Sequence, residues 1–91
     1  MVYEWDSRKA AANLKKHQVA FTEAATVFLD PLALTYQDPD HSEGEQRYIT
    51  LGESTRGPVI LVAHLDRDDR IRIISARRAT RKEAHEYGEE R

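Results

Sequence analysis

The chain has 91 residues, of which 40% are apolar and 33% are charged, and its formal net charge is −2 at pH 7. This length predicts one small domain over residues 1–91 that buries roughly 60–65% of its unfolded surface. The absence of cysteine excludes disulfides and thiolate metal sites and fits a reducing cytoplasm. No apolar run approaches the ~18 residues of a membrane span, and the charged N-terminus argues against a signal peptide. We therefore expect a cytoplasmic globular domain.

The N-terminal part predicts two helices. A first helix over residues 7–17 follows the capping residue Asp6 and contains three consecutive alanines, which favour helix formation. A second helix over residues 23–29 is capped by Thr22 and ends before an Asp-Pro pair. The alternation in Val2–Trp5 indicates a short edge strand before the first helix.

From residue 33 onward the hydrophobic period changes to two, which predicts strands. The expected strands are residues 33–36, 47–52, 59–65 and 71–76. The most apolar of them, 59–65, is expected at the centre, with antiparallel neighbours on both sides. Thr80-Arg81-Lys82-Glu83 fits a capping box and begins a final helix that reaches about residues 87–88.

This order of elements predicts an α+β fold. It has two N-terminal helices, a three- to four-stranded antiparallel meander sheet and one C-terminal helix. All helices are expected on one face of the sheet, which leaves the other face open to a ligand.

Charge is segregated along the chain. Asp30–Glu45 holds five acidic and no basic residues, whereas Arg70–Lys82 holds six basic and no acidic residues. Ten of the 14 basic residues are arginine, whose forked guanidinium suits phosphate recognition. A sequence pI of about 6.1 argues against a general nucleic-acid binder. The basic segment is therefore either a local anion-binding surface or an ordinary solvated one.

The junction between the last strand and the last helix carries the strongest local signal. Arg77 and Arg78 lie together just before the free amides of that helix, an arrangement that suits a phosphate. Strand alternation points Arg72 away from the core, so it adds a third cation to this surface. The alternative is a strand whose arginines pair with Glu83, Glu86 or the acidic loop.

Two histidines are candidates for proton transfer. His64 at the end of the apolar strand is either a general base or a hydrogen-bonded structural residue. His17 is either catalytic or a cation that interacts with the dipole of the first helix, and it shares a polar stripe with Lys9 and Lys16. The chain lacks a glycine-rich phosphate loop, a nucleophile elbow and a paired-histidine zinc motif. Residues 38–43 lack the glycine of a calcium loop, so no metal or cofactor is expected.

Several motifs in order carry a further signal. They are Tyr3-Glu4-Trp5-Asp6, Lys16-His17, Phe28-Leu29-Asp30-Pro31-Leu32, Asp38-Pro39-Asp40-His41-Ser42 and Arg70-Ile71-Arg72-Ile73-Ile74-Ser75-Ala76-Arg77-Arg78-Ala79. Together they resemble the BrnT family of bacterial toxins over about residues 3–87. One departure is Gln18, where the family usually has glycine. A left-handed backbone conformation at the helix end is less favourable for glutamine.

The resemblance implies a RelE-like fold and a type II toxin that cleaves RNA and inhibits translation. It also implies a BrnA-type antitoxin, whose ribbon-helix-helix part binds promoter DNA, and a toxin–antitoxin heterotetramer as one arrangement. In a metal-independent reaction, a base deprotonates the 2′-OH, cations stabilise the phosphate oxygens and an acid protonates the leaving 5′-oxygen.

The roles are assigned to candidate residues as follows. The catalytic candidates are His17, His64, Arg77 and Arg78, and the candidates for RNA or phosphate binding are Lys9, Lys16, Arg47 and Arg72. The alternative function is a non-catalytic module that binds nucleic acid or protein.

Overall fold

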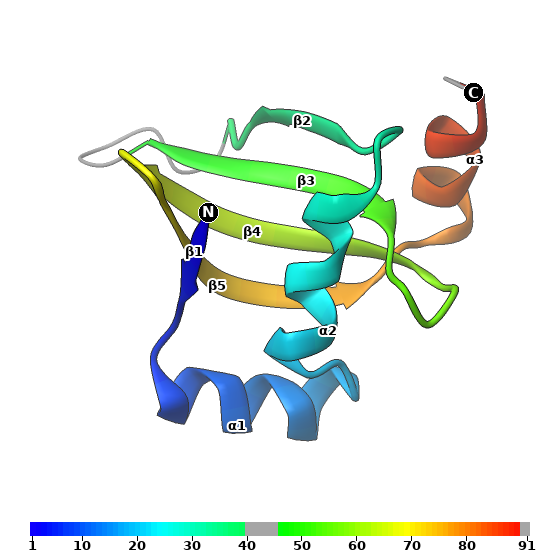
Figure 1. Cartoon of the computed structure of the whole chain (residues 1–91). Coiled ribbons are helices and arrows are strands. Elements are labelled where there is room, and N and C mark those ends of the chain that lie inside the picture. Colours follow the sequence, from blue (N-terminus) through cyan, green and yellow to red (C-terminus); the bar gives the residue numbers. More distant parts are fainter. Residues whose placement is uncertain (40–45, 90–91) are drawn as a thin grey trace.

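The computed structural model describes residues 1–39 and 46–89. In this part of the chain a five-stranded mixed sheet, with the order β1-β5-β4-β3-β2, is flanked by helices (Figure 1). The elements are β1 (Val2–Glu4), α1 (Ser7–His17), α2 (Phe21–Thr26), the 3-10 helix η1 (Val27–Leu29), β2 (Leu34–Gln37), β3 (Arg47–Glu53), β4 (Val59–Arg67), β5 (Arg70–Arg78) and α3 (Arg81–Glu89). Within the described ranges, no helix is long and apolar enough to cross a membrane.

The centre of the sheet is as predicted, and the short strand expected at Val2–Trp5 is present as the edge strand β1, but its pairing is not as predicted. β4 lies between β3 and β5 and pairs with both in antiparallel fashion, which confirms the central position of the most apolar strand. β1 adds a fifth strand, however, and pairs in parallel with Arg70–Arg72 of β5. The expectation of a three- to four-stranded, wholly antiparallel meander is therefore wrong. The connection that begins with α1 lets β1 and β5 run in the same direction.

α1 begins and ends where the sequence predicts. The Asp6 carboxylate accepts hydrogen bonds from the amides of Arg8 and Lys9 at 2.8 and 3.1 Å. The helix ends at Gln18, whose φ of 57° is left-handed. The Gln18 side chain donates to the Lys15 carbonyl at 3.0 Å, a contact that glycine could not make.

α2 begins two residues earlier than predicted, and Thr22 is not its cap. The first helical residue is Phe21, which is only 2% exposed and packs edge-to-face on Trp5. Burial of this ring outweighs the capping preference of Thr22, which is exposed within the first turn. The helix tightens to 3-10 geometry over Val27–Leu29 instead of continuing as α-helix.

The helices occupy both faces of the sheet, which corrects the expectation of a single helical face. α1 and α2 cover the main core on one face. α3 covers part of the opposite face, where Tyr87 packs against Leu51 and Leu61. The Tyr87 hydroxyl donates to Asp30 at 2.5 Å. The ring thus supplies the apolar cover that this end of the sheet needs, and its hydroxyl remains satisfied.

Candidate nucleic-acid interface

A β-bulge in β5 decides which side chains share a face of the sheet. Ala63 of β4 pairs with Ser75, but the next residue, His64, pairs with Ile73. Ile74 therefore has no direct partner in β4. Such a bulge shifts the alternation of the strand by one residue, and bulges are frequent beside functional sites.

Because of the bulge, Arg72 and Arg77 lie on the same face although they are five residues apart. Arg72 pairs with Leu65, and Arg77 pairs with Leu61. Directly paired residues share a face, and positions four apart in β4 point to the same side. Regular alternation in β5 would have put the two arginines on opposite faces.

Arg47 belongs to the same face. It also pairs with Leu65, so Arg47 and Arg72 flank this leucine with Cα atoms about 10 Å apart, twice the strand spacing. Tyr36 on β2 pairs with Ile49, two residues along β3 from Arg47, so it lies on the same face, and it is 43% exposed. Burial and the nearby negative charge of Glu83 raise the pKa of Tyr36. Sequence reasoning missed this tyrosine because its proximity to the arginines depends on the register of four strands.

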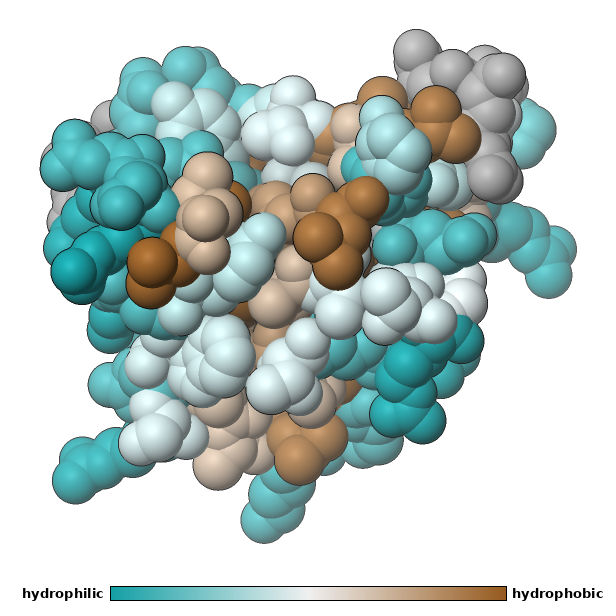
Figure 2. Space-filling model, in the orientation of Figure 1, coloured by the Kyte–Doolittle hydropathy of each residue, from teal (hydrophilic) through white to brown (hydrophobic). Residues whose placement is uncertain are grey.

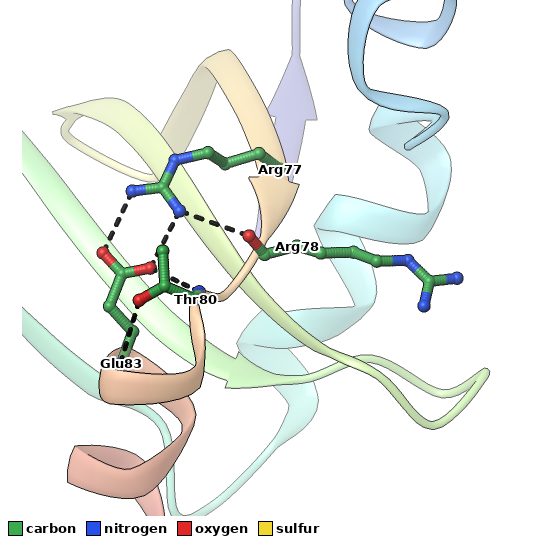
Figure 3. Close-up of polar contacts among 4 residues, drawn as sticks. All are labelled: Arg77, Arg78, Thr80 and Glu83. Atoms are coloured by element: carbon green, nitrogen blue, oxygen red, sulfur yellow. Dashed lines mark hydrogen bonds and ion pairs between the residues drawn. The ribbon is translucent and has the colours of Figure 1, made fainter.

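Arg77 is held by the first turn of α3. Its guanidinium donates to the two carboxylate oxygens of Glu83 at 2.8 and 3.0 Å, and to the Arg78 carbonyl at 3.2 Å (Figure 3). The hydrogen bonds from Arg77 hold the pKa of Glu83 below its ordinary value, and the same pair raises the pKa of Arg77. This Arg77–Glu83 ion pair is the alternative to phosphate binding that the sequence predicts.

The expected convergence of Arg77, Arg78 and the helix amides on one phosphate does not occur. Arg78 extends to the other side of the strand from Arg77, as strand alternation requires (Figure 3). The capping box also occupies the start of α3. Thr80 Oγ1 accepts from the Glu83 amide at 3.1 Å, and a Glu83 carboxylate oxygen accepts from the Thr80 amide at 2.9 Å.

Arg72 bonds to the last residue of β1 and its charge lies near Asp6, the N-cap of α1. It donates to Glu4 at 3.1 Å, and Arg70 donates to the other oxygen of the same carboxylate at 3.3 Å, so the pKa of Glu4 is lowered. Backbone amides dominate the lowering of the Asp6 pKa, and the charges of Lys9 and Arg72 both add to it. Lys9 and Arg72 thus both lie near the Asp6 carboxylate.

A hollow of about 220 Å³ lies between α1 and β5, beyond the end of β1. Its lining comes from one side of α1 and from the bulge, namely Lys9, Ala12, Asn13, Lys16, His17, Ile74 and Ser75. The structure therefore brings together Lys9, Lys16 and His17 from the predicted polar stripe and adds the Ser75 hydroxyl, which sequence reasoning did not single out. We define the basic band as Lys9, Lys16, His17, Arg47, Arg72 and Arg77.

The members of the basic band differ in how strongly they are already neutralised. Within residues 1–39 and 46–89, no carboxylate forms an ion pair with Lys9, Lys16 or Arg47, whereas Arg72 and Arg77 each have one. Among the described residues, an incoming phosphate can bind these three cations without displacing a carboxylate.

Asn13 fixes the position of this hollow. The side chain is only 7% exposed, and its amide nitrogen donates to the carbonyls of Val19 and Ala76 at 2.9 and 2.8 Å. Its oxygen accepts from the Ala76 amide at 3.0 Å. α1 is thereby attached to β5 two residues after the bulge.

His64 lies on the face of the sheet that α1 and α2 cover, away from the arginines. It is 1% exposed, Nδ1 lies 2.7 Å from Asp66, and Nε2 lies 2.7 Å from the Thr50 hydroxyl. The rings of Phe28 and Tyr48 pack against it. Burial lowers the pKa of His64. It is therefore not positioned as a general base for a substrate on the arginine face.

The fold and the basic band define, as a class, a small α+β domain with a cationic surface suited to a polyanion. The family described as "Ribonuclease toxin, BrnT, of type II toxin-antitoxin system" matches residues 5–83, so the chain belongs to the BrnT family of ribonuclease toxins. Its fold is similar to that of the Brucella abortus ribonuclease toxin BrnT, solved at 1.1 Å, with a TM-score of 0.66 and 23% identity over 89% of this chain and 100% of that one. None of the curated proteins compared with the chain matches it.

Proposed function

We propose that this protein cleaves RNA and thereby inhibits translation, as the toxin of a type II toxin–antitoxin system. The observation that carries this proposal is the match to the BrnT ribonuclease toxin family over residues 5–83. The basic band supports it, because cations are needed to hold an RNA phosphate and a titratable group is needed beside them.

The reaction that fits the basic band is attack of a ribose 2′-OH on the adjacent phosphorus. His17 takes the 2′-OH proton, the new O–P bond closes a 2′,3′-cyclic phosphate, and the 5′-oxygen leaves with a proton from an acid. Lys9 and Lys16 beside His17 bind the phosphate. Arg72 and Arg77 stabilise the charge that develops on the non-bridging oxygens. Arg47 binds the neighbouring RNA backbone, the leaving 5′-oxygen takes its proton from solvent water, and none of these residue roles uses a metal ion.

The partner we propose is a BrnA-type antitoxin whose ribbon-helix-helix part binds promoter DNA. Toxin and antitoxin would form a heterotetramer in the cytoplasm. DNA is then contacted through the antitoxin and not through the basic band.

The proposal is tested with the purified protein and a 5′-labelled RNA. We expect cleavage products that end in a 2′,3′-cyclic phosphate, no cleavage when the scissile nucleotide is 2′-deoxy, and an unchanged rate in excess EDTA. Loss of a proton-transfer group typically costs 100- to 10,000-fold, so His17→Asn should slow cleavage at least ~100-fold.

The matched control is His85→Asn, because His85 is an exposed histidine on α3, outside the basic band. It should cleave at the wild-type rate. RNA that is bound but never cleaved would overturn the enzymatic proposal in favour of a binding module. Cleavage of the 2′-deoxy substrate would overturn the mechanism.

A further inference from the structure

The flank of α1 opposite the basic hollow borders an apolar groove between α1 and α2. The groove has a volume of about 200 Å³, and its walls include Trp5, Ala11, Leu14 and Phe21. Leu14 is 49% exposed, although it belongs to a helix of a small domain with a thin core. In Figure 2, tan and brown apolar groups lie among pale ones at the bottom of the molecule, where Figure 1 shows α1.

The floor of the groove is preformed. Trp5 and Phe21 pack edge-to-face with ring centroids 6.0 Å apart, and Phe21 is fixed in the core at 2% exposure. This volume is many times the ~10–15 Å³ that admits one water molecule on the same measure, so the groove has room for a large apolar side chain.

The outer rim of the groove is basic. At 100° per residue, Arg8 and Lys15 project from α1 directly beside the flank that carries Ala11 and Leu14. Both side chains are exposed, and neither forms an ion pair with any residue in the described parts of the chain. The combination of an apolar floor and unpaired cations fits an amphipathic segment with acidic side chains.

We infer that the antitoxin of this system docks here, with one large apolar side chain in the α1–α2 groove and acidic side chains against Arg8 and Lys15. The inference depends on membership of a toxin–antitoxin family and not on the proposed catalytic residues. The groove and the basic hollow are separated by a single helix, about 10 Å wide. On the proposed function alone, a partner that crosses α1 from the groove also covers Lys9 and Lys16 and so blocks the RNA site.

The test measures the affinity of purified toxin variants for the purified antitoxin encoded in the same operon. Leu14→Asp puts a charge over the apolar floor, and Ala11→Arg fills the groove, so each should weaken binding at least tenfold. The matched control is Leu29→Asp, which changes an even more exposed leucine, at 69%, that lies in η1 and outside the groove. It should bind as the wild type does. Arg8→Glu with Lys15→Glu should slow association and reduce its dependence on salt.

RNA cleavage by the same variants separates this inference from the proposed function. Leu14→Asp and Ala11→Arg should cleave RNA at the wild-type rate and resist neutralisation by the antitoxin. If the protein cleaves no RNA, the affinities still decide the docking site. The inference is overturned if both groove variants bind antitoxin as tightly as the wild type, or if Leu29→Asp weakens binding equally. If Leu14→Asp lowers the melting temperature, Ala11→Arg still tests the groove, because it keeps Leu14 and arginine favours helix formation.

Discussion

Asn13 supplies Ala76 with the two hydrogen bonds that a neighbouring strand would otherwise supply. β1 pairs with β5 only as far as Arg72, so the outward amide and carbonyl of Ala76 lie beyond the end of β1. The Asn13 side chain bonds to both. One buried amide thus stands in for a strand, closes the edge of the sheet and fixes α1 beside the bulge that aligns Arg72 with Arg77.

Asn13→Ala should therefore lower the free energy of unfolding. The substitution leaves the amide and carbonyl of Ala76 and the carbonyl of Val19 without these partners. Each buried group left unpaired costs ~1–3 kcal/mol, so the three groups together predict a loss of at least about 3 kcal/mol in urea unfolding. Lys16→Ala, on the exposed side of the same helix, is the control and should change stability by no more than about 0.5 kcal/mol. An equal effect of the two substitutions would show that Asn13 does not hold the edge.

Local signals were sufficient for the elements whose ends depend on nearby residues. Asp6 and the alanine run predict α1 correctly, and the capping box of Thr80 and Glu83 predicts the start of α3. The apolar run Val59–Leu65 predicts the central strand, because only a strand buried on both faces is apolar at successive positions.

The features that depend on distant residues could not be predicted from the sequence. Nothing within Val2–Glu4 indicates a parallel partner, and nothing near Ile74 indicates a bulge that is secured from α1. The bulge changes the face of every side chain after it. Alternation alone therefore separates Arg72 from Arg77, whereas the structure places both on one face and Arg78 on the other.

His64 should make folding sensitive to mildly acidic pH. Burial lowers its pKa in the folded protein below the ordinary value of about 6.5, so the unfolded chain binds a proton first as the pH falls. Stability is then fully present above about pH 6.5 and decreases as the pH falls toward the folded-state pKa. The measurement is urea unfolding between pH 7.5 and 5.5.

Asp66→Asn serves as the diagnostic variant for this pH dependence. The Asp66 carboxylate raises the pKa of His64 and so opposes the effect of burial. Its removal should make the loss of stability on acidification steeper. A stability that stays constant from pH 7.5 to 5.5 in both proteins would contradict the assignment.

Gly52 in β3 lies where a side chain does not fit. A Cβ there would approach the Ala33 Cβ and Val27 Cγ1 to 2.9 Å and the Asp30 carboxylate to 3.3 Å. Overpacking of this kind costs ~1–3 kcal/mol, so Gly52→Ala should lower the thermal midpoint. Gly88→Ala is the matched control, since its Cβ meets nothing within 4 Å. It should stabilise α3 by about 0.5–1 kcal/mol, so opposite signs are expected for the two alanines.

Comparing Arg77→Ala with Arg78→Ala should show which of these two neighbouring arginines contacts the phosphate. Arg77 lies on the same face as Arg72, whereas Arg78 extends to the other side of the strand. Loss of one contact to the developing charge typically costs ~100- to 1,000-fold in rate, which we expect for Arg77→Ala alone. Arg78→Ala should cleave RNA and arrest growth as the wild type does.

Glu83→Gln distinguishes that contact from a structural role of Arg77. The ion pair of Arg77 with Glu83 is partly exposed, at 38% and 20% of the two side chains, so its loss should cost only about 1 kcal/mol of stability. Glu83→Gln removes the opposite charge and keeps the guanidinium, so it should retain most of the cleavage rate. If Glu83→Gln loses as much activity as Arg77→Ala, and both melt equally early, Arg77 acts by fixing α3. Arg47, which has no ion pair within the described residues, then becomes the first candidate for the phosphate contact.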